Sequence, residues 1–129
     1  MPKIILTPEE SENYFHTALC NGSYFASYGK IHYSTEEYNE AKFLLKAVGK
    51  DDRICYEDVL LKMLKSGFSL HFVCNEGAEY NKSITLKDVH KKVKLTPLDH
   101  LNDMINENDD AVTADVILQT VFFGEVIFG

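Results

Sequence analysis

The apolar run close to the C-terminus constrains the fold of this chain most. On a helix, the segment "ADVILQTVFF" (residues 114–123) has one narrow polar edge, formed by Asp115 and Gln119. Apolar side chains cover almost all the rest of its surface: Ala114, Val116, Ile117, Leu118, Val121, Phe122 and Phe123. A helix that is apolar on nearly every side is buried. We therefore predict a core helix at 113–123, capped by Asp110 or Thr113 and ended by Gly124.

The residues after this helix leave two interpretations open. Glu125–Phe128 is either a short edge strand or a tail, and its apolar side chains serve either the core or an interface with a partner. The run from Val116 to Gly129 is shorter than the roughly 18 apolar residues of a membrane helix, and it contains Gln119 and Glu125. We therefore expect no membrane contact.

Capping signatures divide the rest of the chain into elements. Thr7-Pro8 opens a predicted helix at 8–20, and Ser34 with Glu37 opens one at 35–48. Further helices are predicted at 56–66, from Thr85/Asp88 onward, and after a second Thr-Pro pair at 96–97, where Leu98, Leu101 and Ile105 would face inward. Alternation in "SYFASYGKIHY" predicts a strand or a tight pair at 23–33, and "FSLHFVC" with "AEYNKSIT" predicts a hairpin around Asn75–Gly77.

These elements define the predicted fold class. We expect an α+β chain that forms a single helix-rich domain over residues 1–129, with no linker. It has a small antiparallel sheet, whose hairpin lies at about 68–85, and three C-terminal helices.

The net charge of −7 is confined to one end of the chain. Residues 1–94 carry all 13 Lys and Arg against 13 Asp and Glu, whereas residues 95–129 carry seven acids and no Lys or Arg. Such a C-terminal part repels phosphate backbones, which weighs against nucleic-acid binding there.

The segment "LDHLNDMINENDD" holds the most concentrated candidate site. On a helix, Asp99, Asp103 and Glu107 would form one stripe at i, i+4 and i+8, with His100 beside it. Clustered carboxylates with a histidine suit a cation, although the spacing matches no EF-hand loop or HExxH motif. The alternatives are a solvated helix face, an acidic surface for a partner, or pairing with the basic 87–94 helix. The candidate partner-binding residues are Asp99, Asp103, Glu107, Asp109, Asp110, Phe123 and Phe128.

Two other groups of residues suggest binding less strongly. Lys87, Lys91 and Lys94 share one side of a predicted helix, but no arginine or aromatic residue accompanies them, so a solubilising face is the simpler interpretation. The N-terminal tyrosines offer either a stacking platform or a half-buried sheet face, and the second is favoured.

The order of the predicted elements is also that of a winged helix, with "CYEDVLLKMLKSG" as the groove-facing helix and "NEGAE" as the wing tip. Both segments carry acidic residues, which suits a phosphate backbone poorly. Element order alone is an analogy.

No catalytic motif is present. There is no GxSxG, no Walker loop and no CxxC, and the three cysteines are widely spaced, which is typical of free thiols in a reducing compartment. We expect a cytoplasmic protein with no catalytic residue, no metal ligand and no cofactor.

Three functional hypotheses follow from these patterns. The first is a non-enzymatic protein-interaction module with an acidic C-terminal helical face, which binds a protein partner or a second copy of itself. The second is a winged-helix-like DNA-binding regulator. The third is a small enzyme or metal-binding protein that uses His100 and its neighbouring carboxylates.

Overall fold

Local capping bonds set the helix boundaries in the computed structural model, which describes residues 5–49 and 53–129. Helix α1 (Pro8–Cys20) opens with a capping box: the Glu10 N–H donates to Thr7 Oγ1 at 3.1 Å, and the Thr7 N–H donates to Glu10 Oε1 at 2.9 Å. Ser34 caps α3 (Thr35–Ala47). Asp110 caps α7 (Ala111–Phe123), which ends at Gly124 in the left-handed conformation, as predicted.

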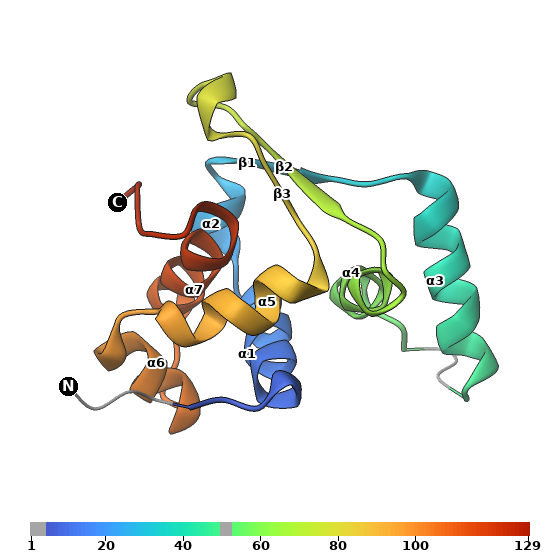
Figure 1. The fold of residues 1–129 in the computed structure, drawn as a ribbon, viewed down its shortest axis with the longest axis horizontal. Helices are drawn as coiled ribbons and strands as arrows, with labels where there is room; N and C mark the ends of the chain where they lie inside the picture. Colours follow the sequence, from blue (N-terminus) through green and yellow to red (C-terminus); the bar gives the residue numbers. More distant parts are fainter. Residues whose placement is uncertain (1–4, 50–52) are drawn as a thin grey trace.

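The remaining helices and three strands complete an α+β fold (Figure 1). The other helices are α2 (Ser23–Ala26), α4 (Tyr56–Lys65), α5 (Leu86–Lys92) and α6 (Leu98–Ile105), with 3-10 turns η1 (Ala78–Tyr80) and η2 (Val93–Leu95). The strands are β1 (Gly29–His32), β2 (Leu70–Cys74) and β3 (Lys82–Ile84). The predicted α+β class with a small antiparallel sheet is confirmed.

Helix α7 forms the centre of the core. Every residue from Thr113 to Phe122 is buried, because α7 contacts α1, α2, α5, α6 and β3. In Figure 1 it lies among the helices on the side of the molecule opposite to α3. No helix among the described residues combines the length and the apolar character needed to cross a membrane.

The antiparallel sheet covers one side of these helices. Its order is β1-β2-β3, so β2 is central. Strand β2 alternates between buried and exposed side chains, with Leu70, Phe72 and Cys74 facing the core and His71 and Val73 facing outward. This period of two is the pattern of a sheet with one solvated face.

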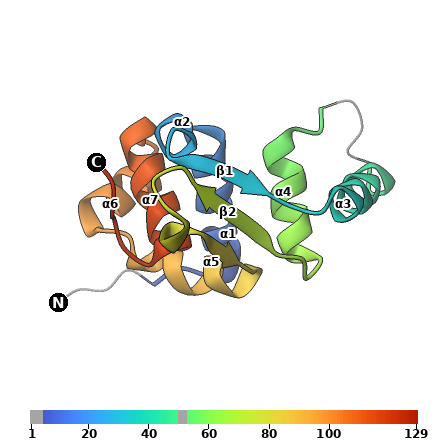
Figure 2. The same cartoon turned by 90° about the horizontal axis from the view of Figure 1, so that it is seen from above.

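Helices α3 and α4 extend from the core. Figure 2 shows α3 at the outer end of the molecule with α4 between it and the other helices, and α3 packs mainly on α4. Ala41 is the one fully buried residue of α3. The helix predicted at 35–48 ends one residue earlier, at Ala47, and the C-cap residue Val48 is 75% exposed.

Helix α1 is joined to its neighbours by ion pairs with limited exposure. Glu12 Oε2 lies 2.7 Å from His90 Nε2 on α5, and Glu12 Oε1 lies 3.6 Å from Lys65 Nζ on α4. His16 Nε2 lies 2.6 Å from Asp58 Oδ1, also on α4. These contacts link α1 to two helices, α4 and α5.

Two strand predictions need correction. Ser23–Ala26 forms the helical turn α2 instead of a strand, because Phe25 reaches the core, where its ring lies 4.5 Å from that of Phe72 and 5.3 Å from that of Phe122. Ala78–Tyr80 forms the 3-10 turn η1, so the second hairpin strand is limited to Lys82–Ile84. In both segments tertiary packing overrides the local alternation.

The buried amide of Gln119 holds the C-terminal tail. Its Oε1 accepts the N–H groups of Ile127 and Phe128, both at 2.8 Å, and its Nε2 donates to the Phe128 carbonyl at 3.0 Å. Nε2 also lies 3.0 and 3.1 Å from the two carboxylate oxygens of Asp115. Because Glu125–Phe128 forms neither helix nor strand, this side chain takes the place of a neighbouring strand.

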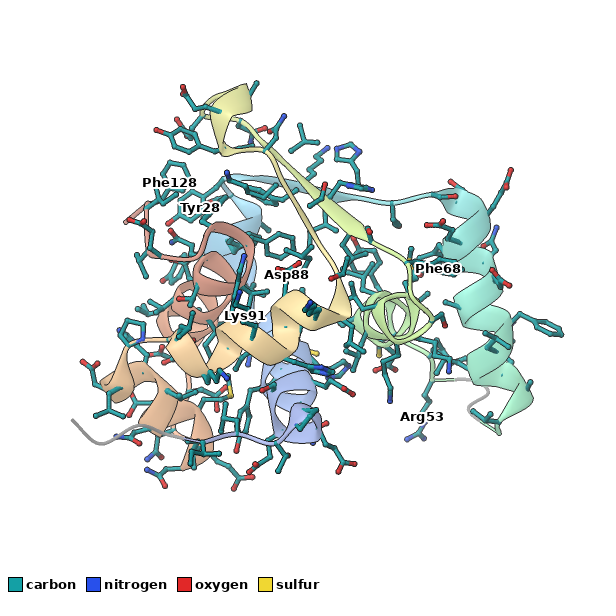
Figure 3. All side chains as sticks on the ribbon, viewed as in Figure 1. Tyr28, Arg53, Phe68, Asp88, Lys91 and Phe128 are labelled. Atoms are coloured by element: carbon teal, nitrogen blue, oxygen red, sulfur yellow. The ribbon has the colours of Figure 1, made fainter. Side chains whose placement is uncertain are left out.

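The docked tail inserts one of its three large apolar side chains. The Phe128 ring lies 4.9 Å from the Tyr28 ring, 5.2 Å from that of Tyr80 and 5.8 Å from that of Phe123. Figure 3 shows the first of these pairs, with Phe128 and Tyr28 close together. Val126 and Ile127 are 42% and 39% exposed. Phe128 therefore extends the core, whereas Val126 and Ile127 stay largely outside it.

We expect Phe128→Ala to lower the free energy of unfolding by about 1.5–3 kcal/mol, because it removes a half-buried ring from three aromatic contacts. Val126→Ala in the same tail should cost less than about 1 kcal/mol, since Val126 is largely solvated. Urea unfolding of the two variants and the wild type measures both changes. Equal losses in the two variants would contradict the docked position of Phe128.

Asp115 gives the tail a dependence on pH. Loss of hydration raises the pKa of its buried carboxyl above 3.8, although hydrogen bonds from Gln119 and Tyr28 act in the opposite direction. The folded state therefore binds this proton more readily than the unfolded state does, and the stability that results is lost as the pH rises through the folded pKa.

Asp115→Asn removes this titration. We expect the variant to gain stability relative to the wild type as the pH rises from about 4 to 7, on top of any constant offset from the altered hydrogen bonds. Chemical unfolding of both proteins over this range measures the difference. A difference that stays constant with pH would contradict the raised pKa.

Candidate interaction surface at the acidic end

Helix α6 carries the acidic residues at the edge of the fold. Its Leu101 and Met104 are buried and face the contact with α7. Leu98 and Ile105 are 47% and 36% exposed, so the prediction that both face inward is wrong. In this short helix, packing on α7 selects the i, i+3 pair Leu101 and Met104, and the side chains flanking that pair remain in solvent.

The second Thr-Pro pair does not repeat the capping of the first. Helix α6 begins at Leu98, and Pro97 occupies the N-cap position without a side-chain bond. Thr96 is buried, and its hydroxyl has no hydrogen-bond partner among residues 5–49 and 53–129. The helix is therefore fixed more by packing than by its cap.

The predicted stripe of three carboxylates is interrupted. Asp99 and Asp103 are exposed on α6, but the helix ends at Ile105, so Glu107 lies beyond it. Glu107 has φ 60°, and its N–H donates to the Met104 carbonyl at 3.2 Å. The N–H of Asn108 donates to the Asp103 carbonyl at 2.8 Å. This closure puts Glu107 in the left-handed position where glycine is usual.

Asp109 and Asp110 have local structural roles. Asp110 Oδ1 accepts the Thr113 N–H at 2.9 Å as the cap of α7, and this bond is the main reason that the pKa of Asp110 is lowered. Asp109 accepts a long bond of 3.5 Å from Asn21 Nδ2 at the end of α1. Both carboxylates are thus engaged with their own chain.

His100 is close enough to Asp110 to contribute to the lowered pKa of that residue. Its Nδ1 is buried and has no partner in the described part of the chain. Within those same residues, no group of three or more His, Cys, Asp or Glu side chains could hold a metal ion. The described geometry therefore offers the metal hypothesis no ligand set.

Phe123 and Phe128 are directed into the fold. Phe123 packs against Phe25 and Phe72 at ring distances of 6.0 and 5.7 Å, as well as against Phe128. Exposed apolar surface on the C-terminal part comes from other residues instead: Leu95, Leu98, Ile105, Val112, Val126 and Ile127. The sequence favoured Phe123 and Phe128 as partner-binding residues, because it does not show which large apolar side chains the core buries and which it leaves exposed to solvent.

The basic residues of α5 form their own local contacts. Lys92 Nζ lies 3.5 Å from Asp88 Oδ1, one turn away. No ion pair of the described residues joins α5 to α6, so the expected internal pairing of basic and acidic helices is not seen there. Lys87, Lys91 and Lys94 are exposed, and Figure 3 shows the Lys91 side chain on α5.

The order of helices and strands agrees with the winged-helix analogy, but the limited exposure of the expected groove-facing helix supports it less well. The expected groove-facing helix α4 lies between α1 and α3, in contact with both. From Glu57 to Leu64 each of its residues is buried or half-buried, and Tyr56 and Lys65 at its two ends are exposed. A helix covered on both sides presents little surface to a DNA groove.

Two of the N-terminal tyrosines, Tyr33 and Tyr38, form a cluster with Tyr56 that the sequence does not predict. The ring of Tyr33 lies 4.9 Å from that of Tyr38 and 6.0 Å from that of Tyr56 at the start of α4. Loss of hydration, followed by the neighbouring Tyr33 hydroxyl, raises the pKa of Tyr56 to about 12. Its hydroxyl therefore stays protonated at neutral pH.

Cys20, at the end of α1, lies close to Glu57 of α4. Burial, and then the charge of Glu57 and a hydrogen bond to it, raise the pKa of the Cys20 thiol, which opposes the formation of a nucleophilic thiolate. Cys20, Cys55 and Cys74 are all free thiols.

No protein-family model, curated protein or solved structure matches this chain.

We expect Glu107→Gly to raise the free energy of unfolding by about 0.5–1 kcal/mol, because glycine adopts positive φ without steric cost. Asp103→Gly removes the same charge from the interior of α6 and should instead lower stability by about 1 kcal/mol. Thermal unfolding of the two variants measures both. Destabilisation by Glu107→Gly would show that its side chain does more than occupy a strained turn.

Proposed function

We propose that this chain is a non-enzymatic protein-interaction module that binds a basic partner through its acidic C-terminal end. The observation that carries the proposal is the exposure of Leu98 and Ile105 beside Asp99 and Asp103 on α6. Leu98 and Ile105 are seven residues apart, so they lie on one side of the helix. Together the four residues form a surface, named here the α6 face, in which apolar contacts adjoin negative charge.

The distribution of charge supports a basic partner. Residues 95–129 carry the whole net charge of the chain, and Asp99 and Asp103 are exposed within them. Complementary charge speeds association and selects partners, while apolar side chains at the centre of a contact supply much of the affinity. A basic segment with apolar residues satisfies both requirements.

The free thiols support a reducing compartment, and we place the interaction in the cytoplasm.

Charge reversal tests the α6 face. Asp99→Lys combined with Asp103→Lys should abolish capture of the partner when the tagged chain is used as bait, because it reverses the charge beside the apolar contact. Glu36→Lys with Glu40→Lys on α3 is the matched control, since these glutamates are also exposed, have the same spacing and give the same change in charge. Quantitative mass spectrometry compares the captured proteins.

The two pairs of variants separate a local surface from net charge. Loss of a partner with the α6 pair alone supports the proposal. Equal loss with both pairs assigns the effect to net charge, and retention with the α6 pair removes these aspartates from the binding surface. Circular dichroism establishes that all the bait proteins are folded.

A further inference from the structure

A second surface, remote in sequence from the α6 face, combines an apolar cavity with an unpaired strand edge. The cavity has a volume of about 370 Å³, which lies in the range of about 300–1,000 Å³ that is usual for ligand pockets. Its walls come from α1, α2, β1, α4 and α7, and its apolar lining includes Leu19, Phe25, Ala26, Ile31, Phe72 and Leu118. Glu57 stands among these residues and accepts a hydrogen bond from the Cys20 thiol.

Strand β1 forms one wall of the cavity, and within residues 5–49 and 53–129 it pairs with β2 alone. Its pairs are Gly29 with Cys74, Lys30 with Val73, Ile31 with Phe72, and His32 with His71. The next pair in the same register is Tyr28 with Asn75, and there the Asn75 N–H donates to the Tyr28 carbonyl at 2.7 Å. This bond identifies which pairs of the ladder are hydrogen-bonded.

Hydrogen-bonded and non-hydrogen-bonded pairs alternate along an antiparallel ladder. Since Tyr28–Asn75 is hydrogen-bonded, Lys30 and His32 direct their backbone groups toward β2, whereas Gly29 and Ile31 direct theirs toward the open edge. Cys74 supports this assignment from the other strand, because its N–H donates to Asn81 Oδ1 at 2.8 Å, away from β1.

The outward N–H and C=O groups of Gly29 and Ile31 have no hydrogen-bond partner among the described residues outside the sheet. Both residues line the cavity. Gly29 is held there by close packing, because a Cβ atom at this position would lie 2.3 Å from the Val73 carbonyl oxygen and 2.8 Å from Phe72 Cζ. The backbone that faces the cavity is therefore fixed, polar and unpaired.

We propose that this groove binds an extended segment of a partner protein, which adds to β1 as a fourth antiparallel or parallel strand and places a large apolar side chain in the cavity. Backbone groups provide affinity in such strand addition, and a side-chain pocket provides specificity. The outward backbone groups of β1 complement another backbone, and the apolar part of the lining offers an apolar side chain its contacts. Lys30, Tyr56 and Glu57 supply further polar groups to the lining.

The shape of the groove favours a single extended segment over the folded edge of a second copy. Residues of α2 and of α4 both line the cavity beside β1, and Figure 2 shows these helices toward opposite ends of the strand. A second copy would bring its own α2 and α4 to the same place, whereas a peptide strand enters alone.

The probe is a fluorescein-labelled peptide of sequence Thr-Val-Thr-Leu-Thr-Val, which is apolar on one side when extended. Fluorescence anisotropy measures its binding, and amide NMR of the protein locates it. Expected are saturable binding and shifts at Gly29, Lys30 and Ile31, with slower hydrogen exchange of the Ile31 N–H. Absence of binding at a peptide concentration of about 1 mM, or shifts confined to α6, would overturn the proposal.

Two N-methylated versions of the peptide test strand pairing. One carries methyl groups on the backbone nitrogens of its odd residues, and the other on those of its even residues. Since one edge of the added strand faces β1, one version should lose binding and the other should retain it. Equal binding of both versions would show that the cavity holds side chains without a backbone ladder, contrary to the proposal.

Protein variants test the cavity. Ala26→Trp should weaken binding at least about tenfold, because it fills the mouth of the cavity from an exposed position. Ser23→Trp, on the same short helix but outside the lining, is the control and should bind as the wild type does. Ile31→Pro removes one outward N–H and should also weaken binding; if it does not fold, Ala26→Trp decides. Unchanged affinity in Ala26→Trp would overturn the proposal.

Charge reversal at Asp99 and Asp103 should leave peptide binding to the β1 groove unchanged. The two proposals are therefore tested independently: either the β1 groove or the α6 face can be ruled out while the other is supported.

Discussion

The burial of helix α7 on all sides is the constraint on which the rest of the structure depends. Ten consecutive residues of this helix, Thr113–Phe122, are buried, so other elements must surround it. Helices α1, α2, α5 and α6 and strand β3 do so. The polar residues of α7 satisfy their hydrogen bonds inside the core: Thr120 Oγ1 donates to the Val116 carbonyl at 2.7 Å, and Gln119 binds the tail and Asp115. The docked tail is thus a consequence of a buried glutamine, which would otherwise be costly.

The elements that enclose the core bury one side against it, and α6 and β1 are left partly uncovered on the other side. Helix α6 covers one part of α7 with Leu101 and Met104, and its flanking side chains Leu98 and Ile105 remain in solvent. Strand β1 is an edge strand of the sheet, and no second strand pairs with it in the described part of the chain. Both proposed binding surfaces therefore lie on elements that cover the core with one side and leave their other side uncovered.

Features that depend on neighbouring residues could be predicted from the sequence. The N-caps at Thr7, Ser34 and Asp110 and the stop at Gly124 all work within one helical turn, and each lies where expected; the Ser34 side chain accepts the Glu37 N–H without the reciprocal bond of a capping box. The sequence also predicted that Asp115 and Gln119 form a polar edge at i, i+4. It did not predict that Gln119 holds the tail. That role requires Ile127 and Phe128 to fold back eight and nine residues along the chain.

Features that depend on tertiary contact could not be predicted in this way. Ser23–Ala26 alternates like a strand, yet it forms a helical turn because Phe25 stacks in the core. Glu107 carries no local signal for positive φ, since glycine is the usual marker of that conformation. The prediction of the acidic site differs most from the structure. Its stripe of three carboxylates required a helix that continues to Glu107, whereas α6 ends at Ile105. Asp99 and Asp103 are exposed, and so are their apolar neighbours Leu98 and Ile105, which the sequence pattern assigned to the core.

The two proposed surfaces recognise different properties of a partner. The α6 face offers charged side chains beside apolar ones, so it distinguishes partners by charge and weakens as salt screens that charge. The β1 groove offers backbone groups, which every extended chain can match, and a mainly apolar cavity that selects one side chain. Because the binding at the α6 face depends on ionic strength more strongly than the binding at the β1 groove, salt separates the two in the intact protein. If both proposals hold, the chain can bind a folded basic partner and an extended segment at once, since α6 and β1 lie apart in both Figure 1 and Figure 2.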